Sequence, residues 1–213
     1  MHKLATGVAK GRRSRLAAMV VATSISLAAG AKETQPLNSD KIRERFGHYG
    51  VELLHQDAIA RLASLYSMSD QRRITRTLAL TRFELPTHPA LAVEDEQIRA
   101  GASIGATLRS AGWQVIKDGQ ADCQTLAGER FARLGGSTLA AEDPVLIRVY
   151  TLKVTGKNLS LDYAVIAEAY HPEHIPPTAE LPCTRTIEDA LSTSQSLALS
   201  GLLSAMNQVD SPS

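Results

Sequence analysis

Two short segments of this chain combine residue types that could do chemistry. The first, Gly101-Ala102-Ser103-Ile104-Gly105, matches G-x-S-x-G, the sharp turn that presents a nucleophilic serine between a strand and a helix. Acids and histidines follow in the chain order used by α/β-hydrolases, namely Asp143, Asp162, His171 and His174. The context argues against this chemistry, because residues 94–100 are charged and helix-like where the motif needs a hydrophobic strand.

The glycines of this segment also have a structural interpretation. Ile98, Gly101, Gly105, Leu108 and Gly112 are spaced three or four residues apart, so in a continuous helix they would share a face that can approach a sheet closely. Each glycine inside a helix costs about 1 kcal/mol relative to alanine, and tight packing would offset that cost. The remaining alternative is a turn at Gly101 that shortens the helix.

The second segment is Glu168-Ala169-Tyr170-His171-Pro172-Glu173-His174, which holds two imidazoles and two carboxylates. Such side chains can bind zinc or another transition metal. The order His-Pro-Glu-His fits neither H-E-x-x-H nor H-x-x-E-H on a helix, and a third histidine would have to come through the fold from His48, His55 or His88. We therefore expect a polar strand end that leads into a solvated loop, with no metal and no cofactor, and the two histidines of the segment remain candidates to test.

Four arginines on one predicted strand could suit an anionic ligand. They are Arg72, Arg73, Arg76 and Arg82. Two of them share a face with leucines, so the interpretation we favour is ion pairing with the acids of the following helix. The chain has no glycine-rich phosphate loop in the strand-loop-helix setting that such a motif requires.

The chain has two cysteines, Cys123 and Cys183. A disulfide between them is the expected state in an oxidising compartment, and the chain-entropy model credits a loop of this size with about 4 kcal/mol of stabilisation. The alternative is two unpaired thiols, since sequence alone does not place their Cβ atoms within bonding reach.

Residues 1–31 are typical of an export signal. The first 15 residues carry five Lys or Arg and no acid, and residues 16–31 carry no charge and end in Ala29-Gly30-Ala31. The apolar run is shorter than the roughly 20 residues that a membrane-spanning helix needs. We predict cleavage after Ala31 and a periplasmic or secreted location. A twin-arginine route through Arg12-Arg13 and an uncleaved anchor are the alternatives.

Removal of residues 1–31 takes away 5 of the 23 Lys and Arg and none of the 22 Asp and Glu, which leaves a formal net charge of −4. A mildly acidic chain without a basic cluster gives no electrostatic argument for binding nucleic acid or anionic lipid. We therefore expect no nucleic-acid partner and no integral membrane segment after signal removal. An envelope or secreted protein is the expected partner.

Strands and helices alternate along the rest of the chain. Ser39 or Asp40 can cap the first helix, and runs of alternating or β-branched residues separated by turn-like residues predict the strands. The expected elements are a helix over 41–46, strands over 51–54, 59–66 and 74–83, a helix over 91–111, a strand over 113–117, a short helix near 125–134, a hairpin of 144–155 and 159–170, and a helix from 186.

These elements predict an α+β fold, in which an antiparallel sheet of meander plus hairpin carries the long helix on one face and a C-terminal helix follows. The expected domains are a cleaved signal over 1–31, a polar lead-in over 32–38, one α+β domain over 39–185, and a C-terminal helix and tail over 186–213. The expected function is a non-catalytic exported protein that binds a partner or helps assembly. A small secreted hydrolase, based on Ser103 or on a metal at the two histidines, is the alternative, and an inhibitor or immunity-type protein would have a similar sequence.

Overall fold

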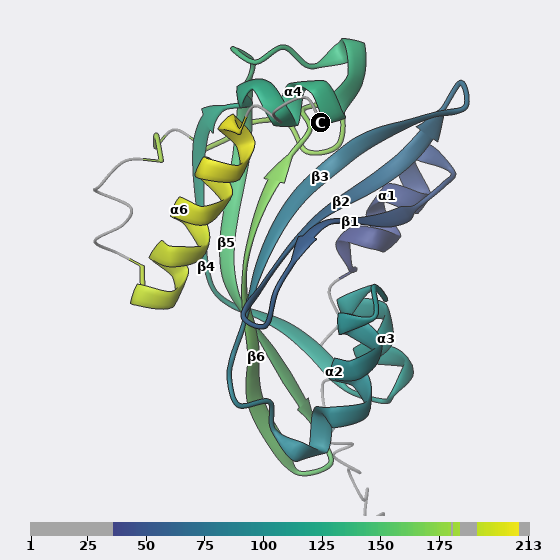
Figure 1. Ribbon diagram of the computed structural model, residues 1–213, viewed down its shortest axis with the longest axis vertical. Helices are drawn as coiled ribbons and strands as arrows, with labels where there is room; N and C mark the ends of the chain where they lie inside the picture. Colours follow the sequence, from purple (N-terminus) through teal and green to yellow (C-terminus); the bar gives the residue numbers. More distant parts are fainter. Residues whose placement is uncertain (1–35, 180, 184–190, 209–213) are drawn as a thin grey trace, which may run out of the picture. The chain divides into compact units, whose positions relative to one another are not determined.

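The computed structural model describes residues 36–179, 181–183 and 191–208, and they form an α+β fold (Figure 1). Six antiparallel strands make one sheet in the order β1-β2-β3-β6-β5-β4. The strands are β1 Gly50–Gln56, β2 Ala60–Ser69, β3 Arg72–Phe83, β4 Gln114–Leu126, β5 Pro144–Gly156 and β6 Leu159–Tyr170. The helices are α1 Asn38–Phe46, α2 Ala92–Arg99, α3 Ile104–Ser110, α4 Gly128–Gly135 and α6 Thr193–Asn207, with short 3-10 turns at Pro89–Leu91 and Gly136–Thr138. No helix in the described ranges has the length and apolar character needed to cross a membrane.

The meander and the hairpin expected from sequence are both confirmed. Strands β1, β2 and β3 pair in chain order, and β5 pairs with β6 across a two-residue turn. At that turn Lys157 and Asn158 have φ values of 50° and 63°, the left-handed conformation that matches the twist of paired strands. The pairing of β3 with β6 joins the meander to the hairpin.

Strand β4 is longer than the expected strand over 113–117. Asp118 and Gly119 do not end it, because the register with β5 shifts between Asp118 and Ala121 and pairing then resumes as far as Leu126. The turn-like dipeptide therefore forms a bulge inside the strand, which a long neighbouring strand can stabilise by pairing on both sides of it.

The prediction of a single helix over 91–111 is wrong. The chain instead forms α2 and α3, separated by a turn in which Gly101 has a φ of +108°. This backbone conformation is open to glycine and strained for other residues, so the alternative of a turn at Gly101 is the one that the structure adopts. The proposed glycine face of a continuous helix does not exist.

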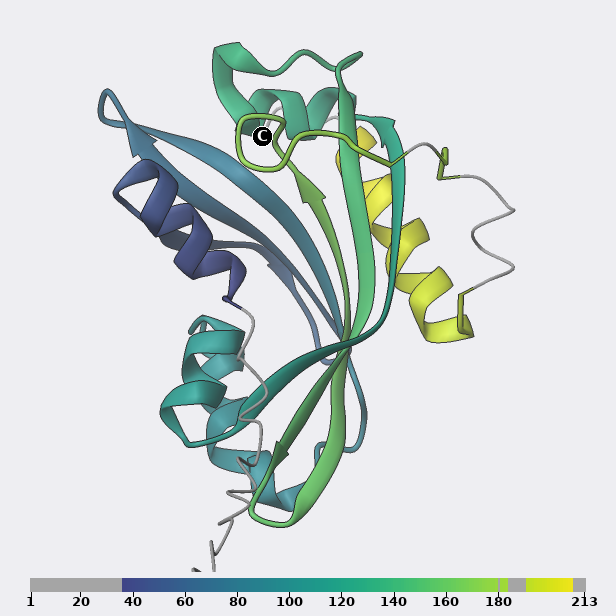
Figure 2. The same ribbon diagram turned by 180° about the vertical axis from the view of Figure 1, so that it is seen from behind.

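Helices cover both faces of the sheet, whereas the sequence predicted a helix on one face. Figures 1 and 2 show α4 and α6 on one side and α1, α2 and α3 on the other. Phe131 of α4 and Leu202 of α6 pack in one core with Val165 of β6, while Ile98 of α2 packs in a second core with Ile166. The last eight residues of β6 are all buried as a result, as expected for a central strand that is covered twice.

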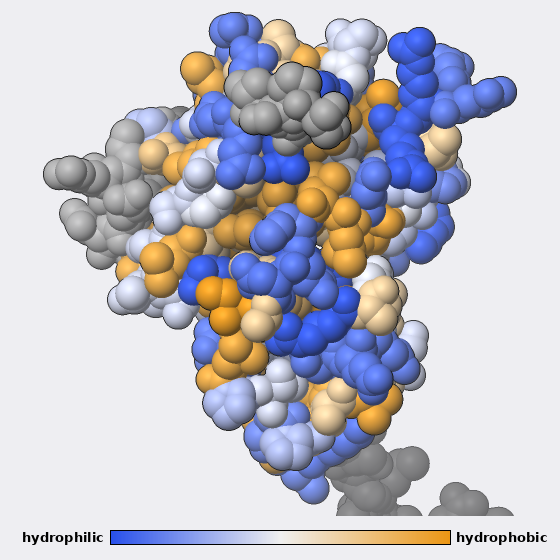
Figure 3. All heavy atoms as spheres, viewed as in Figure 1, coloured by the Kyte–Doolittle hydropathy of each residue, from blue (hydrophilic) through white to orange (hydrophobic). Residues whose placement is uncertain are grey.

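Apolar side chains also gather near the middle of the first face, over β1 and β2 (Figure 3). Leu54 of β1 and Leu80 of β3 are partly buried and pack against the core that contains α6. The apolar face of the sheet under α6 therefore includes residues of β1 and β3.

The disulfide is confirmed: the sulfur atoms of Cys123 and Cys183 are 2.01 Å apart. The bond holds the segment after β6 against the free edge of β4, where Gln124 and Pro182 form an isolated bridge. Helix α6 follows with Ser192 as its N-cap, and the part of the expected helix over 186–190 lies outside the described residues, as does the expected signal over 1–31.

Replacing both Cys123 and Cys183 by serine should lower the free energy of unfolding by about 2–4 kcal/mol, because the bond closes a loop with a sequence separation of 60 in the unfolded chain. Chemical denaturation of the wild type with and without a reductant, beside the double serine variant, measures this. Equal unfolding midpoints in all three samples would contradict the stabilising role of the bond.

Candidate functional site

A cavity of about 80 Å³ lies between the sheet and the helices α1 and α3. Its lining is mostly apolar and includes Leu65, Ile104, Val115, Leu152 and Ile166. Four of these come from β2, β4, β5 and β6, so the cavity extends across the sheet rather than along one strand. Such a concave apolar space with a few polar groups is the usual form of a small-molecule site.

Small side chains create this space. The strand register sets Ala63 opposite Ala79, and Ala79 opposite Glu168, so two alanines lie beside each other in the middle of the sheet. Neither fills the gap below the helices. At the helix side, Gly105 of α3 lets Leu37 approach so closely that an added Cβ would lie 2.7 Å from the leucine Cδ2 atom.

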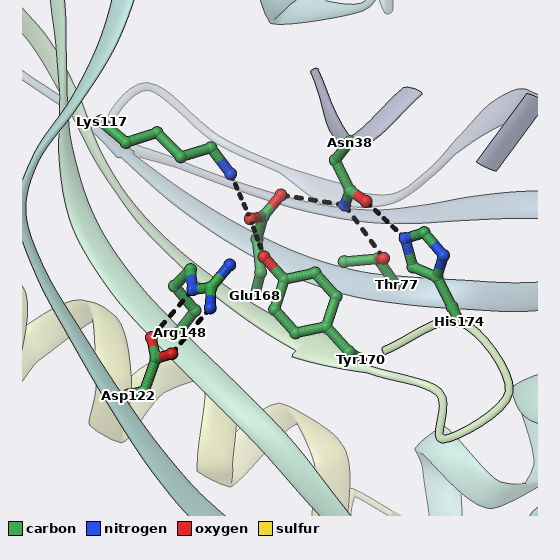
Figure 4. Close-up of polar contacts among 8 residues, drawn as sticks. All are labelled: Asn38, Thr77, Lys117, Asp122, Arg148, Glu168, Tyr170 and His174. Atoms are coloured by element: carbon green, nitrogen blue, oxygen red, sulfur yellow. Dashed lines mark hydrogen bonds and ion pairs between the residues drawn. The ribbon is translucent and has the colours of Figure 1, made fainter. Parts of the chain in front are cut away.

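A buried carboxylate, Glu168, lines one end of the cavity at the centre of a polar cluster (Figure 4). Its Oε2 atom accepts a hydrogen bond from Lys117 Nζ at 3.0 Å and another from the Tyr170 hydroxyl. Its Oε1 atom accepts a bond of 3.1 Å from the Asn38 amide. We call Asn38, Lys117, Glu168 and Tyr170 the Glu168 cluster. Every charge that it buries is therefore paired, as a buried ion requires.

The cluster keeps its carboxylate ionised. Burial on its own would raise the pKa of Glu168, but the Lys117 ammonium and the Tyr170 hydroxyl together hold that pKa below its ordinary value. Burial and the neighbouring charge of Glu168 raise the pKa of the Tyr150 and Tyr170 hydroxyls well above the usual range. At neutral pH both tyrosine hydroxyls are thus un-ionised beside a carboxylate ion.

An arginine on β5 forms a second ion pair beside this cluster. Arg148 lies opposite Glu168 in the strand register and binds Asp122 of β4 through two hydrogen bonds of 2.8 and 2.7 Å. These bonds raise the pKa of the guanidinium further. The geometry is the strong bidentate form, so Arg148 is already occupied and is not free to bind a ligand.

His174 supports the cluster from the segment that follows β6. Asn38 uses its NH₂ group to donate to Thr77 at 3.0 Å and to Glu168, so its Oδ1 atom must accept the 2.6 Å bond from His174 Nε2. The histidine is therefore the tautomer with its proton on Nε2. Its Nδ1 atom is buried without a hydrogen-bond partner among the described residues. Burial, with the nearby cations, lowers the pKa of His174 to about 4.

The other polar end of the cavity holds Arg61, Tyr49 and Ser103, which we call the Arg61 end. Arg61 is 2% exposed, and its Nη1 atom donates to the carbonyls of Ile98 and Ala102 at 2.9 Å each. The Tyr49 hydroxyl donates to Ser103 Oγ at 3.2 Å. Burial raises the pKa of Tyr49 and lowers that of Arg61. Arg61 thus ties β2 to the turn between α2 and α3, and Ser103 follows directly after that turn.

The structure does not bring the expected hydrolase residues together. Ser103 bonds to Tyr49, whereas Asp143 accepts from the backbone N–H of Ala140 and Asp162 lies 3.8 Å from Lys153 Nζ. No hydrogen bond joins Ser103 to an acid or an imidazole among the described residues. Ser103 precedes the short helix α3 and lines the cavity, with Tyr49 as its hydrogen-bond partner.

The two candidate metal ligands also have other partners. His171 Nε2 lies 3.3 Å from Thr138 Oγ1, and its Nδ1 atom accepts from the backbone N–H of Glu173. Burial lowers the pKa of His171 as well. The expected solvated loop is wrong at both histidines, because His171 and His174 are 0% and 5% exposed. The described part of the chain has no group of three or more potential metal ligands.

The four strand arginines do not pair with the acids of α2 as expected. Arg76 binds Glu173 at 2.5 Å and Arg73 binds Glu52 at 3.0 Å, while Asp95 of α2 pairs with its own helix neighbour, Arg99. The segment after β6 and strand β1 supply these acids because each lies beside the arginine in the folded chain.

The sequence interpretation missed Arg61 and Lys117 as site residues, and it considered Glu168 for metal binding alone. A signal was available for two of them. Arg61 stands on the same strand face as alanine and leucine, and Glu168 interrupts a run of alanine and β-branched residues. Charged residues are rarely buried without a partner, so an ion inside an apolar strand indicates a special site.

No protein-family model and no curated protein matches this chain. Several solved structures show partial similarity, and three of them are described here. The ligand-binding domain of a regulator assigned to the GntR family from Bordetella bronchiseptica has a TM-score of 0.41 and 14% identity and covers 59% of this chain and 87% of that one. A protein described as a regulator from Escherichia coli CFT073 has a TM-score of 0.39 and 9% identity, and the match covers 57% of this chain and 94% of that one. The C-terminal domain of YurK from Bacillus subtilis has a TM-score of 0.33 and 12% identity, and the match covers 60% of this chain and 90% of that one. Similarity at this level says nothing about what this chain binds.

Stability should fall in acid because of His174. Its pKa is about 4 in the folded chain against an ordinary 6.5, so the unfolded chain binds the proton first and the stabilisation is lost as the pH falls from about 6.5 to 4. His174→Gln keeps a donor to Asn38 and cannot titrate. The wild type should lose about 3 kcal/mol more than this variant between pH 7 and pH 4.

Urea unfolding of both proteins at several pH values measures the difference. His48→Gln changes an exposed histidine and is the matched control, which should follow the wild-type curve. If the free energy of unfolding changes with pH in the same way for the wild type and His174→Gln, folding does not lower the pKa of His174.

Proposed function

We propose that this chain is an exported, non-catalytic binding protein of the cell envelope or secreted space, and that it binds a small molecule in the cavity below α1 and α3. The observation that carries the proposal is the cavity itself. Both cores beside it are filled by large side chains such as Phe131 and Trp113, while Ala63 and Ala79 leave space at the centre of the sheet. Empty volume in a core costs stability, so a space of this kind is consistent with a ligand that fills it.

The polar groups around the cavity favour binding over hydrolysis. The Glu168 carboxylate is engaged by three donors, and Ser103 has a tyrosine as its partner rather than an imidazole. A serine nucleophile needs a base within hydrogen-bond reach, and among the described residues no hydrogen bond joins Ser103 to an acid or an imidazole. The expected assembly partner becomes, in this proposal, a small ligand held inside the fold.

Export is the second part of the proposal. A disulfide between Cys123 and Cys183 agrees with an oxidising compartment, and the N-terminal segment has the charge pattern of a secretory signal. The mature protein should begin at Lys32 and should be recovered from the periplasmic or secreted fraction of a bacterial host. N-terminal sequencing and fractionation test this, and an intact Met1 in the exported fraction would contradict cleavage.

Binding in the cavity is tested with probes of one shape and different charge: cyclohexanol, cyclohexanecarboxylate and cyclohexylamine. At least one of them should bind the wild type in calorimetry or raise its melting temperature. Ala79→Leu adds three carbons at the cavity wall and should abolish that binding while the protein stays folded.

Ala106→Leu is the matched control for this variant, because Ala106 lies on α3 and is exposed. It should leave the binding of each probe unchanged. If no probe binds the wild type, or if Ala79→Leu binds as well as Ala106→Leu does, the cavity is not the binding site.

A further inference from the structure

We infer that the ligand of this cavity is an organic acid whose carboxylate pairs with Arg61 while its apolar body fills the space above Ala63 and Ala79. This inference rests on the proposed function and names the chemical class of its ligand. It is carried by a buried cation at the Arg61 end for which the described residues supply no counter-charge.

The charges that line the cavity do not balance. Arg61, Lys117 and Glu168 are its charged lining residues. Lys117 and Glu168 neutralise each other at 3.0 Å, which leaves the charge of Arg61 in excess. No salt bridge joins Arg61 to an acid within the described ranges, although its side chain is 2% exposed. A buried guanidinium is always charged and is costly without a counter-ion, so an anionic ligand would relieve that cost.

The guanidinium also has an unused binding edge. Its Nη1 atom is occupied by the carbonyls of Ile98 and Ala102, whereas its Nε atom is buried and has no hydrogen-bond partner among the described residues. The Nε–H and Nη2–H groups of an arginine point in parallel and match the two oxygens of a carboxylate. The two carbonyl bonds thus orient the guanidinium, and the edge that recognises a carboxylate has no hydrogen-bond partner among the described residues.

A hydroxyl group lies at the same end of the cavity. Ser103 Oγ accepts a hydrogen bond from the Tyr49 hydroxyl, so the O–H group of Ser103 is available to donate to a further acceptor. Ser103 is adjacent in the chain to Ala102, whose carbonyl binds Arg61. A carboxylate at the Arg61 end could therefore receive hydrogen bonds from both residues. This assigns Ser103 a role in ligand recognition rather than in nucleophilic attack.

The Glu168 end of the cavity favours the same orientation of the ligand. Glu168 is already paired with Lys117, so this pair offers no net charge to an acidic group, and Val115 and Leu152 supply an apolar part of the lining. The ligand would therefore place its carboxylate at Arg61 and its uncharged part towards Val115 and Leu152.

The test compares cyclohexanecarboxylate with cyclohexanecarboxamide, which has nearly the same shape without the charge. Calorimetry on the wild type should show that the carboxylate binds at least about tenfold more tightly. Arg61→Gln should lose that preference and bind the two probes within about twofold of each other. Arg72→Gln, which changes an exposed arginine outside the cavity, should behave as the wild type does.

Two further measurements keep the test decisive if Arg61→Gln does not fold. Arg61→Lys keeps the charge without the planar edge and should bind the carboxylate with intermediate affinity. In the wild type, the arginine Nε–H resonance that disappears in Arg61→Lys should shift when cyclohexanecarboxylate is added and should move much less with the amide.

The outcomes separate this inference from the proposed function. If cyclohexanol or cyclohexylamine binds in the cavity but the carboxylate has no advantage over the amide, the cavity is a binding site and the inference is wrong. The same holds if the carboxylate binds Arg61→Gln as tightly as it binds the wild type. If no probe binds the wild type, both fail together.

Discussion

The pairing of β3 with β6 is the contact on which the rest of this structure depends. It joins a meander and a hairpin, each of which forms from neighbouring segments of the chain, and β4 pairs with β5 to complete the sheet of six strands. It also makes β6 a central strand that helices cover on both faces. The buried residues of β6 must therefore be apolar, or their polar groups must be hydrogen-bonded or ion-paired. Glu168 is a charged residue of this strand, and its carboxylate is both hydrogen-bonded and ion-paired.

The two buried ions of the cavity differ in how they are stabilised. Donors from β4, β6 and α1 converge on Glu168, so three separate elements must be in place before its charge is satisfied. Arg61 donates hydrogen bonds to two backbone carbonyls and pairs with no acid among the described residues. A folded protein usually pairs such groups because an unpaired buried ion costs several kcal/mol. This contrast distinguishes a structural ion from one that we assign to recognition.

The segment after β6 holds three distant parts of the fold together. His174 bonds to Asn38 of α1, Glu173 pairs with Arg76 of β3, and Cys183 is linked to Cys123 of β4. The bond from His174 to Asn38 anchors α1, which forms one wall of the cavity. A proline-rich connection without regular structure is thus fastened by side chains instead of by a backbone ladder, which explains why its histidines are buried.

The sequence by itself determined the α+β class, the meander and the hairpin, and it allowed one disulfide between its two cysteines. Alternation, β-branching and turn preference act between near neighbours, and two cysteines permit one pairing. The tertiary structure decided the rest. A turn at Gly101 replaced a continuous helix because the strand residue Arg61 binds the carbonyls there, and pairing with β5 carried β4 past Asp118. The cavity and its unbalanced charge arise only when the strand register sets side chains from β2, β4 and β6 around one space, which no local pattern can encode.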